Sequence, residues 1–193
     1  MDKNPLVLLE LVERLGNLMR RELRKAGTDE TLQPVHLQAL IYLTKANRYS
    51  NTPQALADYL GLTKGTVSQT LLVLDRRGLI ERYQDDVDRR VVRLRLSASG
   101  EQLLYESQPT LPWQNATRNI SPNRIHAVSA LREALVTMQE DNEGRPFGAC
   151  NSCAHCQKLS QRIYRCGQMG DRLSGPETRK ICWIYEAKAE ETA

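Results

Sequence analysis

The stretch at residues 51–82, NTPQALADYLGLTKGTVSQTLLVLDRRGLIER, limits the fold of this chain more than any other. Thr52 precedes a proline and a helical pattern, so it is expected to cap a helix that ends at Gly61. Thr63 is expected to cap a second helix, which ends at Gly78. The buried stripe of this second helix would be Val67, Leu71 and Leu74. Two short helices joined by a glycine-bearing turn form a helix-turn-helix.

Two segments with a strand pattern follow directly. LIERY and RVVRLRLS flank the turn sequence QDDVDRR. The second segment alternates apolar and charged side chains, which is typical of a half-buried strand. The apolar positions are Val92, Leu94 and Leu96, and the charged ones are Arg93 and Arg95. A helix-turn-helix followed by a two-stranded hairpin is a winged helix, so the predicted fold class is mainly α with a small β-hairpin wing.

Further helices are predicted on both sides of this unit. One amphipathic helix runs from Pro5 to about Lys25, and another begins near Pro34. The second would bury Leu37, Leu40, Ile41 and Leu43. A helix follows Gly100 and is interrupted or ended by Pro109 and Pro112, and the last long helix begins at Ser121–Pro122. The polar linker EDNEGRPFG then predicts two domains, residues 1–141 and 142–193.

Composition and charge limit the class of protein and its expected location. The chain has 193 residues, of which 40% are hydrophobic and 26% charged, and it contains no apolar run that could span a bilayer. Its N-terminus lacks the features of a secretory signal, so we expect a cytoplasmic protein without membrane contact. A net charge of +4 permits a nucleic-acid partner without requiring one.

The order of these elements resembles the MarR family of transcriptional regulators over roughly residues 5–141. The resemblance is carried by LTKGTVSQTLLVLDRRGLIER and DDVDRRVVRLRLSASG. The family's wing reads Asp-x-Arg, a short strand, Leu-Ser or Leu-Thr, and Gly, which are here Asp88, Arg90, Leu96, Ser97 and Gly100. The resemblance implies a homodimer, built from the first and last long helices, that binds a palindromic operator in double-stranded DNA. The two long apolar stripes independently favour a dimer.

The residues themselves have suitable chemistry for DNA. Small residues at the start of the second helix allow it to enter a major groove, and hydroxyls and an ammonium group can reach phosphates. Gln69 can reach a base edge, with adenine the best match. The predicted contacts are Thr63, Lys64, Gly65, Thr66, Ser68 and Gln69 on the helix, with Arg89 and Arg90 on the wing. Arginine on a hairpin suits a narrow minor groove, and the resemblance implies that Asp88 orients it. Each residue alone would be more typical of a solvated surface. The ordered set favours DNA binding.

All five cysteines lie in the last quarter of the chain: Cys150, Cys153, Cys156, Cys166 and Cys182. A disulfide framework needs an oxidising compartment, and c-type haem attachment needs Cys-x-x-Cys-His, which is absent because Ala154 follows Cys153. Zinc suits four thiolates but usually takes two close pairs. An iron–sulfur cluster tolerates scattered ligands, and Cys-x2-Cys-x2-Cys begins a bacterial ferredoxin motif, here without its closing Cys-Pro.

The tail also resembles a cysteine-bearing extension of some MarR-like proteins, through RPFGxCxxCxH, CG, LSxxET and ICxxxE. That pattern implies the ligands Cys150, Cys153, Cys166 and Cys182. Cys156 would then be a spare thiol. Four thiolates favour a 4Fe-4S cluster, with 2Fe-2S and zinc as the alternatives. The few apolar residues of the tail would need such a metal staple.

The leading hypothesis is therefore a dimeric regulator whose cluster senses redox state or iron and changes operator binding. Because the tail follows the last long helix, the cluster is expected to act through that helix. The alternatives are a repressor with a structural zinc site and a small-molecule effector, or an electron-transfer protein. An enzyme is not expected, because the sequence offers no glycine-rich cofactor loop, acid pair or nucleophile–base set.

Overall fold

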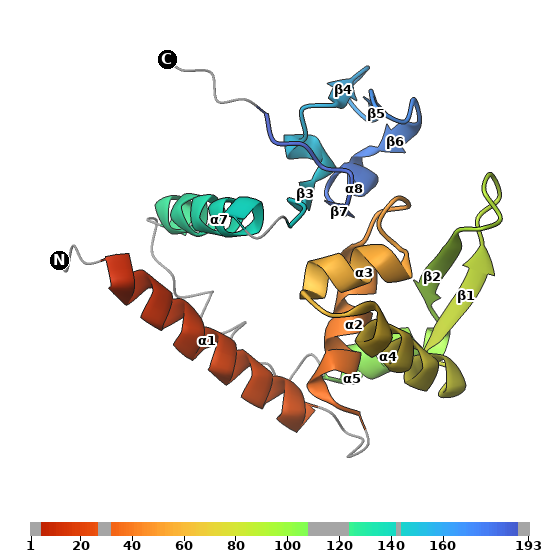
Figure 1. The fold of residues 1–193 in the computed structure, drawn as a ribbon. Coiled ribbons are helices and arrows are strands. Elements are labelled where there is room, and N and C mark those ends of the chain that lie inside the picture. The colour runs from red at the N-terminus through yellow and green to blue at the C-terminus, as the bar shows by residue number, and fades with distance from the viewer. Residues whose placement is uncertain (1–4, 27–31, 108–123, 142–143, 189–193) are drawn as a thin grey trace.

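The computed structural model describes residues 5–26, 32–107, 124–141 and 144–188 (Figure 1). Its first part contains α1 (Pro5–Ala26), α2 (Pro34–Lys45), α3 (Pro53–Leu60), α4 (Lys64–Arg76), β1 (Ile80–Gln84), β2 (Val92–Leu96) and α5 (Ala98–Ser107). After a further helix, α7 (Arg124–Asp141), come the small elements of the C-terminal tail. The predicted mainly helical fold with a two-stranded wing is confirmed.

Local sequence signals account for the helix-turn-helix. The Thr52 hydroxyl accepts the Ala55 N–H at the start of α3, and the Thr63 hydroxyl accepts the Thr66 N–H at the start of α4, each at 3.2 Å. Gly61 ends α3 with a φ of 64°, a left-handed conformation that glycine adopts without strain. The caps predicted from the sequence are therefore present.

The core of the winged helix lies between α2, α3, α4 and the hairpin. Its fully buried large side chains are Leu37, Leu40, Tyr42, Leu56, Val67, Leu71, Leu74 and Leu94. The antiparallel register places Ile80 opposite Leu96 and Gln84 opposite Val92. The expected alternation in β2 is only partly right: Val92 is exposed, and Arg93 is half-buried because its guanidinium makes hydrogen bonds described below. Ile41 is likewise only partly buried, at the edge of this core.

Ser97 and Gly100 close the corner between the hairpin and α5. The Ser97 hydroxyl donates to the Gly78 carbonyl and accepts the Gly100 N–H. A Cβ on Gly100 would lie 2.1 Å from the Leu79 carbonyl oxygen, so only glycine fits there. The Ser-x-x-Gly motif thus fixes the base of the wing against the end of α4.

We expect Gly100→Ala to lower the free energy of unfolding by roughly 1–3 kcal/mol, because the new methyl group must displace backbone. Urea unfolding followed by circular dichroism measures this loss. Gly65→Ala is the matched control, also in the first turn of a helix, where a Cβ would meet only Thr63 Oγ1 at 3.9 Å. Equal stability of the two variants would contradict the packing argument.

The long helices leave apolar side chains exposed in the single chain. On α1, Leu23 joins the buried core, but the rest of the stripe faces solvent. Exposed apolar residues include Leu8, Leu11, Val12, Leu15, Leu18 and Met19 on α1, and Val128, Leu131, Leu135 and Met138 on α7. The predicted breaks at Pro109 and Pro112 and the predicted helix start at Ser121–Pro122 lie outside the described residues. No described helix is both long and apolar enough to cross a membrane.

The tail, residues 144–188, folds into two small sheets. One pairs β3 (Gly148–Ala149) with β7 (Ile181–Cys182), and the other has the order β4 (Cys156–Lys158), β5 (Ile163–Cys166), β6 (Arg172–Ser174). A 3-10 turn at Cys150–Ser152 and a short helix, α8 (Gly175–Thr178), complete it. Figure 1 shows the tail above α3, and the Trp183 indole N–H donates to Asp58 of α3 at 2.8 Å, so the tail contacts the winged helix. The proposed division after residue 141 stays a prediction.

Candidate nucleic-acid interface and cysteine cluster

The outward face of α4 has the composition predicted for it. The side chains of the predicted helix contacts are all exposed: Thr63, Lys64, Gly65, Thr66, Ser68 and Gln69. The hydroxyls of Thr63 and Thr66 lie 2.9 Å apart and share a hydrogen bond, so Thr63 acts first as the helix cap. The N-terminal turn of α4 therefore presents backbone N–H groups, hydroxyls and one ammonium group to solvent, which is a surface suited to phosphate.

The wing carries its arginines at the turn between β1 and β2. Arg89 and Arg90 are both exposed. Asp88 Oδ1 accepts the Arg90 backbone N–H at 3.0 Å and the Arg90 Nε at 3.1 Å, so the carboxylate fixes both the turn and the guanidinium. The pairing of Asp88 with Arg90, which the sequence resemblance implied, is present.

A second carboxylate, missed by the sequence analysis, holds the turn from inside. Asp85 accepts the backbone N–H groups of Val87 and Asp88 at 3.0 Å each, and Arg93 Nε at 2.7 Å. These donors, with the Asp88 N–H the strongest, lower the pKa of Asp85 from 3.8 to about 2. The wing turn is thus built on a charged carboxylate.

The sign of that pKa shift predicts an acid-sensitive wing. Because the folded pKa lies below the unfolded value, the stabilising contribution of Asp85 is fully present above about pH 4 and is lost as the pH falls toward 2. We expect the amide NMR signals of Val87 and Asp88 to titrate in this acidic range. Asp85→Asn should abolish that titration, whereas Asp86→Asn, at an exposed neighbouring position, should leave it intact.

The five thiols of the tail, called here the cysteine cluster, are Cys150, Cys153, Cys156, Cys166 and Cys182. Three of them, Cys150, Cys166 and Cys182, pack in one buried group with Tyr49 and Leu173. The four predicted ligands are buried, and Cys156 is half-buried opposite Cys166 in the β4–β5 pair. All five are free thiols. The sequence spacing alone did not show that these segments meet; the folding of two small sheets achieves it.

The thiols also influence one another's pKa. A hydrogen bond to Cys182, together with burial, raises the pKa of Cys150, and the same bond lowers the pKa of Cys182. Burial raises the pKa of Cys156, with smaller contributions from Cys150, Cys153 and Cys166. Cys153 in turn acts on Cys182. Each thiol therefore lies in the field of at least one other.

The chemistry of this donor set fits an iron–sulfur cluster. Four buried thiols come from the 3-10 turn, the residue after it, β5 and β7, and the Asn47 amide Nδ2 lies 3.2 Å from Cys150 Sγ as a hydrogen-bond donor. Such N–H donors to sulfur are the contacts by which proteins tune clusters. Within the described residues, no group of three or more His, Cys, Asp or Glu side chains has the arrangement of a metal-ion site as it stands. Binding of a cluster or of zinc stays a prediction.

Residues 47–51, NRYSN, join the tail to the winged helix and are called here the connector loop. Tyr49 OH donates to Asp171 at 2.7 Å, Arg48 pairs with Glu177, and the Trp183 N–H donates to Ser50 Oγ at 2.7 Å. Sequence reasoning missed this loop entirely. The one available signal was a polar run, carrying a tyrosine, between two well-defined helices.

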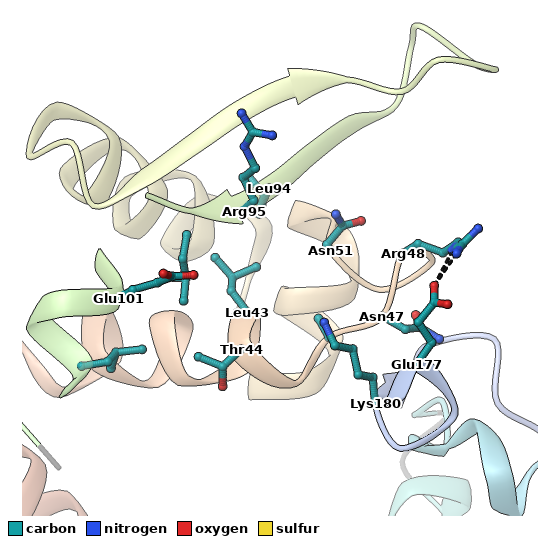
Figure 2. Close-up of a pocket in the computed structure, with 13 residues that line it drawn as sticks. Leu43, Thr44, Asn47, Arg48, Asn51, Leu94, Arg95, Glu101, Glu177 and Lys180 are labelled. Carbon is teal, nitrogen blue, oxygen red and sulfur yellow. Dashed lines mark hydrogen bonds and ion pairs between the residues drawn. The ribbon is translucent and has the colours of Figure 1, made fainter. Parts of the chain in front are cut away.

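A cavity of about 660 Å³ lies where α2, β2, α5 and the tail meet (Figure 2). Its apolar wall includes Leu43, Leu94, Leu96 and Leu104. Its charged groups come from different elements, with Arg95 on β2, Glu101 on α5, and Lys180 following α8. The mixture of apolar wall and charged rim gives room for a small amphipathic molecule.

Comparisons with known proteins agree with this geometry. Residues 31–91 match the model of the MarR family. The transcriptional repressor MprA of Escherichia coli K12 is 34% identical over 101 residues, a match that covers 52% of this chain and 55% of MprA. The chain therefore spans about half the length of the curated relatives it matches.

Solved structures show the same fold. The transcriptional regulator BldR from Sulfolobus solfataricus is similar with a TM-score of 0.57 and 20% identity, over 71% of this chain and 99% of that one. A MepR–DNA complex from S. aureus is similar with a TM-score of 0.53 and 22% identity, over 71% and 99% of the two chains. At these identities the likeness concerns the fold alone.

Proposed function

We propose that this protein is a transcriptional regulator of the MarR type that binds double-stranded DNA as a homodimer, because residues 31–91 match the model of that family. Two observations carry this proposal. Every predicted contact residue at the start of α4 is exposed, and the Asp88 carboxylate holds Arg90 in place on the wing. The apolar stripes of α1 and α7 support the dimer, because a single chain leaves them in water. MepR, of the same fold, has been solved in complex with DNA.

Selection from a random-sequence DNA library tests the DNA-binding half without knowledge of the operator. A dimer of winged helices should select an inverted repeat whose half-sites lie about one helical turn, roughly 10 base pairs, apart. Analytical ultracentrifugation of the free protein should give twice the mass of the chain. A monomer, or a library with no enriched sequence, would contradict the proposal.

The second half of the proposal concerns the thiols of the tail. Cys150, Cys153, Cys166 and Cys182 would bind an iron–sulfur cluster, and the state of that iron–sulfur cluster would modulate operator binding. The burial of all four thiols supports it, as does the packing of Cys150, Cys166 and Cys182 in one buried group. When bound, such a cluster would supply a centre that responds to oxidants or to iron supply. Protein purified without oxygen should be brown, contain iron and sulfide, and change its DNA affinity on exposure to air.

A second candidate function rests on the cavity in Figure 2. In this alternative, the thiols bind a structural zinc ion. DNA binding is then controlled by a small amphipathic molecule that occupies the cavity. Colourless protein with stoichiometric zinc, whose DNA affinity ignores air, would favour this alternative over the cluster. Metal analysis of the purified protein therefore separates the two candidates.

A further inference from the structure

The connector loop is bound to the tail at the cysteine cluster itself. The side-chain amide of Asn47 donates to Cys150 Sγ at 3.2 Å, and its backbone N–H donates to the Ile181 carbonyl, beside Cys182, at 2.9 Å. Ser50, which is fully buried, accepts the Trp183 N–H on the other side of Cys182. The loop thus contacts the chain on both sides of one predicted ligand and the sulfur of another.

The same loop is bound to the wing on its opposite side. Arg93 Nη1 donates to the Arg48 carbonyl at 2.6 Å, and the Leu94 N–H donates to the Asn51 carbonyl at 2.7 Å. Arg93 Nε reaches the Asp85 carboxylate, on which the wing turn is built. A displacement of the loop would therefore move β2 and the support of the wing turn together.

Asn47 connects these two sides. It is buried, and its Oδ1 accepts both the Tyr49 N–H at 3.0 Å and the Ser50 hydroxyl at 2.7 Å, while its Nδ2 donates to Cys150. A buried amide that makes three hydrogen bonds cannot rotate without leaving polar groups unpaired. Movement of the Cys150 sulfur is thereby converted into movement of the connector loop.

We propose that the connector loop transmits the state of the cysteine cluster to the wing, with Asn47 as the positioning residue between them. This inference rests on the proposed function. In the structure described, all five thiols are free, and Asn47 already holds the loop through its bond to Cys150. Because these thiols do not have the arrangement of a metal site, binding of a cluster would move the Cys150 sulfur toward the other ligands. Asn47 would then carry the loop and, through Arg93, the wing with it. The route differs from the one expected from the sequence, which ran through the last long helix.

Two variants remove contacts at opposite ends of the proposed route, one at the tail and one at the wing. Asn47→Asp keeps the oxygen acceptors for Tyr49 and Ser50 but removes the N–H donor to sulfur. Arg93→Gln removes the guanidinium contacts to the loop and to Asp85 without touching the tail. Asn151→Asp, at an exposed position next to Cys150, is the matched control for the added charge.

The quantity to measure is the ratio of the DNA dissociation constants with and without the cluster. Coupling between two sites in a protein is typically about 5- to 150-fold, so we expect a ratio of this size in the wild type and Asn151→Asp. Both route variants should reduce it to about twofold or less. The midpoint potential of the cluster is a separate readout: Asn47→Asp should lower it, because a hydrogen bond to sulfur is lost, and Arg93→Gln should leave it unchanged. Hydrogen exchange of residues 80–96 should differ between the two states in the wild type and in Asn151→Asp, and should not differ in the two route variants.

The outcomes distinguish the inference from the function it rests on. Folded Asn47→Asp and Arg93→Gln proteins that keep the wild-type ratio would overturn the connector route, while the cluster-dependent regulator would stand. Wild-type protein without a cluster, or with the same DNA affinity in both states, would overturn both. Thermal unfolding by circular dichroism identifies any variant that fails to fold. In that case the milder change Asn51→Ala, which removes only side-chain contacts to Tyr83 and Arg93, serves as the wing-side test and should likewise reduce the ratio.

Discussion

Cys166→Ser is expected to eliminate the visible absorption and the bound iron of protein purified without oxygen, whereas Cys156→Ser should retain both. Cys166 is buried at the end of β5, and a serine hydroxyl, which deprotonates far less readily than a thiol, is a much weaker ligand for iron than a thiolate. Cys156 lies directly across the β4–β5 pair from it, so the two substitutions alter the same sheet by the same single atom. The pair therefore separates loss of a ligand from loss of local structure.

The Cys166 variant should also loosen the tail. Apart from its cysteines, the buried apolar group of the tail consists of Leu173 with Tyr49 from the connector loop, which is too little for a stable core. Loss of a metal staple should therefore increase hydrogen exchange throughout β4, β5 and β6 while α2 to α4 remain protected. Equal iron loss in both variants would show that Cys156 is a ligand and that the assigned set is wrong. Full iron content in Cys166→Ser would exclude that residue.

The sequence predicted those parts of the fold that depend on near neighbours along the chain. Thr52 and Thr63 cap helices through residues three positions away, and the buried stripe of α4 repeats with the helical period. The wing was predictable for the same reason, since its two strands and turn are consecutive. Even the pairing of Asp88 with Arg90 spans only two residues.

Contacts between distant segments could not be predicted in this way. Asn47 and Cys150 are separated by 103 positions, and no local pattern marks an asparagine as a partner for sulfur. In the sequence, Arg93 is an ordinary outward-facing charge in an alternating strand. In the structure, its guanidinium donates to two acceptors of the connector loop and to Asp85. The cysteines were recognisable as a set from their number and confinement, whereas their packing against the connector loop depended on the tertiary fold.

Arg90→Ala is expected to weaken DNA binding about tenfold and to reduce the slope of log affinity against log salt concentration by about one. Arg90 is exposed at the wing turn and held by Asp88, so its guanidinium is placed for a narrow minor groove without losing side-chain freedom on binding. Fluorescence anisotropy at several salt concentrations, with the selected operator, measures both quantities. Arg162→Ala, an equal loss of charge at an exposed position in the tail, should change neither.

Asp88→Asn then distinguishes positioning from simple charge. The substitution removes a negative charge from the wing, so electrostatics alone predicts tighter binding to DNA. If Asp88 instead acts by orienting Arg90, the asparagine variant should bind more weakly, because it loses the negative charge and the Oδ2 acceptor that help to hold the guanidinium. Asp86→Asn supplies the pure charge effect at an exposed neighbouring position and should tighten binding. Tighter binding by both variants would show that the orientation of Arg90 contributes nothing to DNA recognition.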